Sequence, residues 1–157
     1  MKQTDYHDLW TALGGQFSLG KHSIHGPAHW RRVEEIGLHL CNHVAADIEV
    51  VRLFAVFHDS CRQNESHDPK HGARGAKLAT DLRGKMFDLD NARFEKLSYA
   101  CVNHTFGMIS DDPTIGTCWD SDRLDLWRVG VIPSPKMLNT DRAKTDEVIE
   151  WTRDMPR

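Results

Sequence analysis

The stretch that decides the fold is LFAVFHDSCRQNESHDPKHGARGA, residues 53–76. Its first five residues are apolar, as are Val50 and Val51 just before Arg52, and apolar side chains on every side are typical of a buried helix. That run ends in the adjacent pair His58 and Asp59. Burying an ionised carboxylate beside an imidazole is costly unless something pairs with them, and a metal ion fits both side chains. The sequence therefore predicts a metal site at the end of a core helix.

The composition is that of an ordinary globular protein. The chain has 157 residues, 39% of them hydrophobic and 27% charged, with a formal net charge of -3. This length predicts a single domain spanning residues 1–157 with one core. The charge gives no footprint for a nucleic-acid duplex or an anionic membrane surface. Ten histidines are many for this length and hint at metal chemistry.

Several absences bear on location. No run approaches the ~20 apolar residues of a membrane span. The N-terminal stretch MKQTDYHDLWTAL contains acids and lacks the apolar core of a secretory signal. The four cysteines are widely spaced, so we expect them to be reduced and the protein to be cytoplasmic.

The fold class predicted is all-α, a bundle of about six helices, because no stretch alternates apolar and polar residues with a period of two. The main helices are expected over residues 4–13, 27–46, 47–61, 71–83 and 91–105. Residues 106–117 are expected to form a loop, followed by a helix that Asp120 or Ser121 caps and that ends before Pro133. The last twenty residues suggest a turn and a polar helix.

Five of these helical patterns each carry one His or Asp on the same face as their apolar stripe. Side chains at i, i+3 and i+4 share a helix face, so each of the five points toward the common core. These residues are His29, His58, His71, His104 and Asp122. One buried histidine usually pairs with a hydroxyl or carbonyl, but five such residues would each need a separate partner. Together with Asp59 they can instead share one or two first-row metal ions.

Residues from about 25 to 133 resemble the HD-domain superfamily of metal-dependent phosphohydrolases. His29 in HGPAHWRRV resembles the first histidine of that family, and the pair His58 and Asp59 resembles the doublet that names it. Asp122 in WDSDRLDL resembles its final aspartate, with Ser121 where alanine is common.

Two further histidines sharpen the resemblance. His71 in HGARGA and His104 in NHTFG resemble the additional histidines of the dinuclear HD enzymes, among them bacterial dinucleoside polyphosphate hydrolases. The mononuclear HD 5′-nucleotidases typically have an acidic residue three positions after the aspartate of the doublet. Arg62 stands at that position and argues against this branch.

The resemblance implies hydrolysis of a nucleotide or another small phosphate ester or anhydride by a metal-bound hydroxide. It implies that Asp59 bridges two ions, with His29, His58 and Asp122 completing one and His71 and His104 the other. The identity of the metal stays open among Fe, Mn, Ni, Co, Zn and Mg, and its number between one and two ions.

Asp59 and Arg62 are the predicted catalytic residues. Arg62, Arg74 and Lys70 are predicted to bind the substrate phosphate, because basic side chains, and guanidinium groups above all, match phosphate. For Arg62 the alternative is a salt bridge to Glu65 or Asp59. For Arg74 and Lys70 the alternative is a plain surface charge.

Other polar residues are assigned outside this set. His39 and His43 lie at i and i+4 but off the main stripe, and we interpret them as solvated. Arg123 is expected to pair with a neighbouring acid. His25 stays open between a loop histidine and a residue that orients a metal ligand.

Two other functions compete with hydrolysis. A diiron oxygenase is one, because a few HD-fold enzymes use the same ligands to activate dioxygen. A non-catalytic nucleotide-binding or regulatory domain is the other, but such a domain predicts a broken ligand set, and the set here is unbroken.

Overall fold

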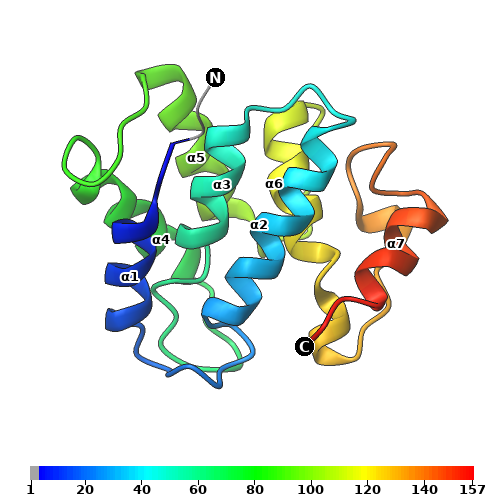
Figure 1. Ribbon diagram of the computed structural model, residues 1–157, viewed down its shortest axis with the longest axis horizontal. Helices are drawn as coiled ribbons and strands as arrows, with labels where there is room; N and C mark the ends of the chain where they lie inside the picture. The colour runs from blue at the N-terminus through cyan, green and yellow to red at the C-terminus, as the bar shows by residue number, and fades with distance from the viewer. Residues whose placement is uncertain (1–3) are drawn as a thin grey trace.

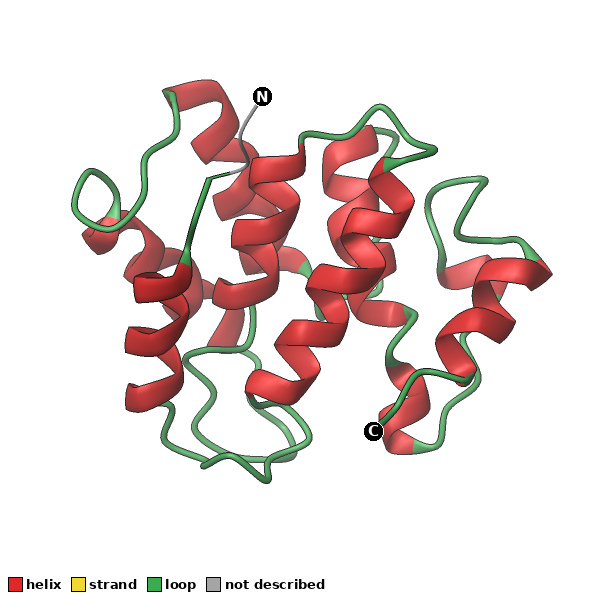
Figure 2. Cartoon of the chain, viewed as in Figure 1, coloured by secondary structure: helices red, strands yellow, loops and turns green. Residues whose placement is uncertain are grey.

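The computed structural model describes residues 4–157. Over these residues the chain forms seven α-helices and two short 3-10 helices, and no strand beyond an isolated bridge between Arg83 and Phe87. The elements are α1 (His7–Gln16), α2 (Pro27–Cys41), α3 (Ile48–Phe57), α4 (His71–Leu82), α5 (Asn91–Asn103), α6 (Pro113–Arg123), η1 (Leu126–Val129), η2 (Pro135–Met137) and α7 (Asp146–Arg153). The all-α class and the helical bundle are therefore confirmed (Figures 1 and 2).

Helix α3 lies in the middle of the bundle, and α2, α4, α5 and α6 pack around it (Figure 1). Every residue from Val50 to Phe57 except Arg52 is buried, which explains why this helix is apolar on every side. Burial of each large side chain contributes about 1.5–3 kcal/mol, so α3 contributes strongly to core stabilisation. At its N-terminus, the carboxylate of Asp47 accepts the Val50 N–H at 3.1 Å and pairs with Arg93 of α5.

Some helix boundaries differ from the predicted ones. Helix α1 runs through Gly14 and Gly15, beyond its predicted end at residue 13, and α2 ends at Cys41, before its predicted end at residue 46. Helix α3 ends at Phe57, and residues 58–61 continue as turns. No helix within residues 4–157 combines the length and apolar character needed to cross a bilayer. All four cysteines are free.

Helix α6 begins earlier than the sequence predicted. Asp112 caps it by accepting backbone N–H groups of its first turn, and Pro113 is its first residue. Asp120 is therefore not a cap but a buried acceptor inside the helix. As a consequence, Asp122 lies in the last turn of α6 rather than the first turn of a later helix.

The C-terminal segment packs against α2 and α6, and α7 lies on the outer side of α2 in Figure 1. A second apolar cluster joins them, made of Ile36, Leu40, Leu124, Leu138, Ala143, Val148 and Met155. The Asp120 carboxylate fastens the segment, since it accepts backbone and side-chain hydrogen bonds from Asn139 and Thr140 at 2.6–2.9 Å.

Helix ends gather on one side of α3. Helices α2 and α4 begin there, with His29 in the first turn of α2 and His71 as the first residue of α4. Helices α3, α5 and α6 end there, and His58 and His104 are the C-terminal caps of α3 and α5. The fold thus brings five segments that are distant in sequence to one point.

Close approach of α4 to its neighbours depends on two glycines. A Cβ atom at Gly72 would overlap the carbonyl oxygen of Cys101 in α5, and one at Gly75 would overlap the carbonyl oxygen of Phe57 in α3. Both obstacles are backbone atoms that cannot rotate away. The glycines therefore fix how closely His71 approaches the end of α3.

Gly75→Ala is expected to lower the free energy of unfolding by about 3 kcal/mol, the upper end of typical overpacking costs, because neither helix backbone can yield. Denaturant unfolding measures it. Gly15→Ala is the matched control, because an added Cβ meets no atom within 4 Å there. That variant should be neutral or more stable, since alanine favours a helix over glycine. Equal stability of Gly75→Ala and wild type would contradict the close packing of α4.

Candidate metal centre

Four of the six predicted ligands form a first group. The Nε2 atom of His29 lies 3.1 Å from Nε2 of His58 and 3.1 Å from Oδ1 of Asp122. The Oδ2 atom of Asp59 lies 3.4 Å from His29 Nε2 and 3.6 Å from His58 Nε2. The two histidines are fully buried, and the side chain of Asp122 is 15% exposed.

The other oxygen of Asp59 belongs to a second group. Its Oδ1 atom lies 3.0 Å from Nε2 of His71 and 3.3 Å from Nε2 of His104. These two nitrogens are 3.0 Å apart. The Asp59 carboxylate therefore stands between the two groups and gives one oxygen to each.

The spacing within each group suits a shared ion. Two ligand atoms about 2.1 Å from one metal, at right or tetrahedral angles, are about 3.0–3.4 Å apart. Most distances within the two groups fall in or near that range. In the first group, ligand atoms of His29, His58 and Asp59 all lie within 4.8 Å of one another. In the second group, the same holds for Asp59, His71 and His104.

Each imidazole is held so that Nε2 faces the centre. The Nδ1 atoms all contact oxygens, so each Nδ1–H can donate a hydrogen bond and leave the Nε2 lone pair free for a metal. The acceptors are a carboxylate oxygen of Asp125 for His29 at 2.7 Å, the carbonyls of Phe54 and Ala55 for His58, that of Asp68 for His71, and that of Cys101 for His104 at 2.7 Å. Four histidines with one common orientation fit a metal centre better than four separate hydrogen-bonded core histidines.

The electrostatics also favour a cation. Burial raises the pKa of Asp59 and Asp122, but the surrounding imidazoles outweigh burial and hold both pKa values well below the usual range. Burial lowers the pKa of His29, and Arg128 adds to this. The carboxylates of Asp122, Asp125 and Asp59 reverse both effects and raise its pKa to about 9. The centre thus contains ionised carboxylates around a point that attracts positive charge.

Asp125 also belongs to the candidate site, although no sequence pattern singled it out. Its buried carboxylate accepts hydrogen bonds from His29 Nδ1 at 2.7 Å, from Arg32 Nε at 2.9 Å and from Arg157 Nη2 at 2.9 Å. The available signal was its position three residues after Asp122, which places both carboxylates on one side of the chain. Asp125 orients His29 and fixes its tautomer.

Asp125→Asn is expected to weaken metal binding about 10–100-fold, because loss of this charge frees the His29 ring and lowers its basicity. Competition with a chromophoric chelator measures the affinity. Asp81→Asn is the control, since Asp81 is exposed and pairs only with Lys77 on the surface of α4. An unchanged metal affinity in Asp125→Asn would show that metal binding by His29 does not depend on its hydrogen bond to Asp125.

His25 and Arg62 both lie beside Asp59. His25 is buried, its Nδ1 is 3.5 Å from Asp59 Oδ2, and its Nε2 contacts the Glu65 carbonyl at 3.1 Å. Arg62 Nε is 3.7 Å from Asp59 Oδ1, while its Nη1 donates to the carbonyls of Asn64 and Ser66. Among the described residues, neither His25 Nδ1 nor Arg62 Nε has a hydrogen-bond partner.

The other predicted phosphate ligands lie elsewhere. Arg74 donates to both carboxylate oxygens of Asp68, at 2.6 and 2.7 Å, and to the Cys61 carbonyl. Lys70 is exposed at the residue before α4. Neither side chain lines the cavity that Asp59, Asp122 and His104 border.

A cavity of about 280 Å³ opens onto the ligands. Asp59, Asp122 and His104 line it on the side of the metal centre. Its remaining lining is partly apolar, from Leu126, Val129 and Met137, and partly basic, from Arg62, Arg123 and Arg128.

The expectation for Arg123 was wrong. Instead of pairing with an acid, it donates to the carbonyls of Met137 and Met108 at 2.7 and 2.8 Å. Arg128 was not singled out in the sequence at all. Backbone acceptors have no side-chain signature, which is why neither placement could be read from residue types.

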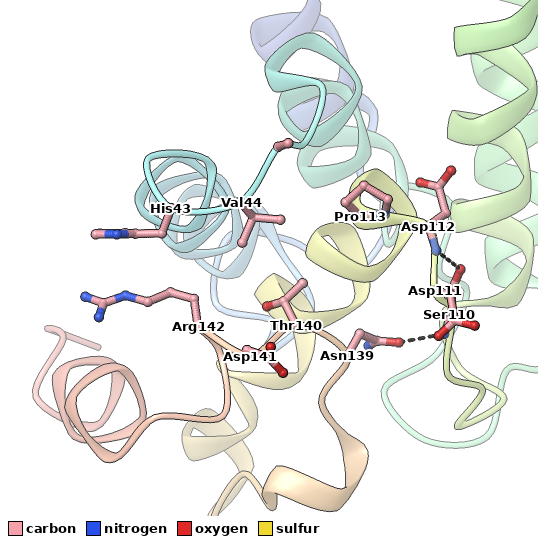
Figure 3. A pocket seen from close by; sticks show the side chains of 11 residues that line it. His43, Val44, Ser110, Asp111, Asp112, Pro113, Asn139, Thr140, Asp141 and Arg142 are labelled. Atoms are coloured by element: carbon pink, nitrogen blue, oxygen red, sulfur yellow. Dashed lines mark hydrogen bonds between the residues drawn. The ribbon is translucent and has the colours of Figure 1, made fainter.

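A larger cavity, of about 400 Å³, lies between the C-terminal end of α2, the start of α6 and the loop after η2 (Figure 3). Figure 3 shows Ser110 hydrogen-bonded to Asn139 and Asp112. Asp112 also caps α6, and Arg142 pairs with Glu147 at 3.1 Å. None of the six candidate ligands lines this cavity.

Comparison with models of protein families matches residues 28–144 to the family described as HD domain. All six candidate ligands lie within that range. Neither the curated proteins nor the solved structures gave a match.

Proposed function

This chain belongs to the HD domain family of metal-dependent hydrolases, and from that premise we propose that it hydrolyses a nucleotide or another small phosphate ester or anhydride. One observation carries the proposal. The two oxygens of Asp59 are divided between two pairs of imidazoles whose Nε2 atoms all face the same centre. A carboxylate with one oxygen in each ligand group can hold two ions close together, as two-metal phosphoryl transfer uses them.

The residues present fit two divalent ions. His29, His58, Asp122 and one oxygen of Asp59 would hold one, and His71, His104 and the other oxygen would hold the second. Divalent ions there would lower the pKa of a bound water and neutralise phosphate oxygens. Because four of the six ligands are imidazoles, the set suits Mn, Fe, Co, Ni or Zn better than Mg.

Two residues beside Asp59 would act on the reactants. If His25 Nε2–H donates to the Glu65 carbonyl, His25 Nδ1 is free to accept a hydrogen bond from the attacking water. Arg62 has its Nη1 tied to backbone carbonyls, so its Nε–H is free to donate to a phosphate oxygen. In the reaction the water oxygen bonds to phosphorus as the phosphorus–oxygen bond to the leaving group breaks. The attacking water loses one proton, and the leaving oxygen takes up one proton, so the step balances.

The surroundings of the centre support a small organic phosphate. The apolar side of the cavity, from Leu126, Val129 and Met137, provides room for a base or another organic group beside the phosphate. We further propose a cytoplasmic location, where the four free cysteines would stay reduced.

The test uses protein purified without chelator. Metal analysis is followed by a panel of nucleotides, dinucleoside polyphosphates and simple phosphate esters, with release of phosphate or nucleotide as the readout. We expect turnover that chelation removes and that His7→Ala, a change on the exposed side of α1, leaves intact.

The same preparation distinguishes hydrolysis from oxygen chemistry. Dioxygen consumption together with a mixed-valent iron signal, and no turnover of any phosphate compound, would contradict the proposal and support the oxygenase instead. Metal-loaded protein that is inactive in both assays would contradict an enzymatic role.

A further inference from the structure

Three arginines on the cavity wall share an unusual environment. Each hydrogen-bonds to backbone carbonyls, and none has a carboxylate within hydrogen-bonding distance among the described residues. The acceptors are the carbonyls of Asn64 and Ser66 for Arg62, those of Met108 and Met137 for Arg123, and those of Ile24 and Asp125 for Arg128. The carbonyls fix the position of each guanidinium group but do not neutralise its charge.

Other partly buried arginines of this chain are neutralised. Arg32 pairs with Asp125 at 2.9 Å, and Arg74 pairs with Asp68 at 2.6 Å. In contrast, Arg62 makes a longer ion pair with Asp59, at 3.7 Å, and the same carboxylate oxygen also faces His71 and His104. Arg123 is buried and has carbonyl partners in place of a carboxylate. A buried charge without a carboxylate is costly, so its retention points to an anion that binds beside it.

The cavity lining carries more positive charge than one bound phosphate would neutralise. Three guanidinium groups face two carboxylates, those of Asp59 and Asp122. The proposed ions would be neutralised by these carboxylates and by the phosphate under attack. The three arginines would then be free to bind additional negative charge. Arg123 lies in α6 and Arg128 in η1, whereas Arg62 follows α3.

We infer that the substrate is an organic diphosphate or polyphosphate, with one phosphate at the ligand cluster beside Arg62 and a second held by Arg128 and Arg123. This inference rests on the proposed function, and it narrows the substrate class. A substrate with a single terminal phosphate would leave Arg128 and Arg123 without an anion. The apolar residues Leu126, Val129 and Met137 of the same cavity would contact the organic group.

The test is binding, which needs no turnover. Inorganic phosphate and pyrophosphate are titrated calorimetrically into metal-loaded protein, with the metal content determined before and after. We expect pyrophosphate to bind at least about ten-fold more tightly than phosphate, because a second set of charge-assisted hydrogen bonds is made. Arg128→Ala should remove about ten-fold or more of the pyrophosphate affinity and change phosphate affinity less than about three-fold.

The controls separate charge from structure. Arg153→Ala removes the same charge from an exposed site on α7 and should change neither affinity. Since Arg128 also holds two carbonyls, Arg128→Gln is the second variant. It keeps a hydrogen-bond donor, loses the charge, and should show the same selective loss if the inference holds.

The outcomes are distinguishable from failure of the proposed function. Equal affinities of wild type for phosphate and pyrophosphate, or an equal loss of both in Arg128→Gln, would overturn the inference even if the enzyme hydrolyses monoesters. Selective pyrophosphate binding that depends on Arg128 would support it even if no hydrolysis is found.

Discussion

Asp59→Ala is expected to remove both ions and to abolish hydrolysis, the largest effect of any single substitution in this chain. The reason is its position, since Oδ2 is 3.4 Å from His29 Nε2 and Oδ1 is 3.0 Å from His71 Nε2. Each other candidate ligand contacts one group, whereas Asp59 contacts both. Metal analysis and phosphate release measure the result. Asp88→Ala, on an exposed side chain, is the control.

The same variant should stay folded. Chelation of the wild type should lower its melting temperature, because ions that bind only the native state stabilise it by about 4 kcal/mol at 1,000 times Kd. Removing the ions also leaves the Asp59 and Asp122 carboxylates close together around His29. Asp59→Ala removes one of these charges, so it should melt no lower than metal-free wild type and should not respond to added metal. A wild type whose melting temperature and metal content both resist chelation would contradict the metal centre.

The convergence of the six candidate ligands could be predicted because each lies in or next to a regular helix. Helical periodicity places His29, His71 and Asp122 on the same faces as apolar residues, and those faces must point inward. His58 and His104 cap α3 and α5, so the phase of each helix still holds at its last turn. The site is therefore encoded mainly by local patterns, which a single sequence displays.

The rest of the site depends on tertiary contacts. The true start of α6 was signalled by Asp112 and Pro113, but Asp120 and Ser121 offered an equally good cap, and only packing of Asn139 against Asp120 decides between them. Asp125 looks like any acid in a polar turn until His29, 96 residues away, is placed beside it.

The positions of the arginines also depend on tertiary contacts. Arg74 lies on the predicted helix, but it forms an ion pair with Asp68, which belongs to the irregular loop before α4. Arg128 reaches the cavity because backbone carbonyls hold it, and the position of a carbonyl depends on the path of the chain. Residue types alone carry no record of that path.

His71→Ala is expected to reduce the metal content from two ions per chain to about one and to abolish hydrolysis. The second group has only His71, His104 and Asp59 Oδ1, so loss of one imidazole leaves two ligands. The first group keeps His29, His58, Asp122 and Asp59 Oδ2 and should retain its ion. His104→Ala should behave in the same way.

The stoichiometry of the wild type decides between the two forms of the site. Elemental analysis after dialysis against excess metal should saturate at two ions per chain in the wild type and in the control His7→Ala. Saturation of the wild type at one ion would contradict the dinuclear centre and leave His71 and His104 to bind phosphate. Even then both Nδ1–H groups would donate to backbone carbonyls, so each Nε2 could bind phosphate only after protonation.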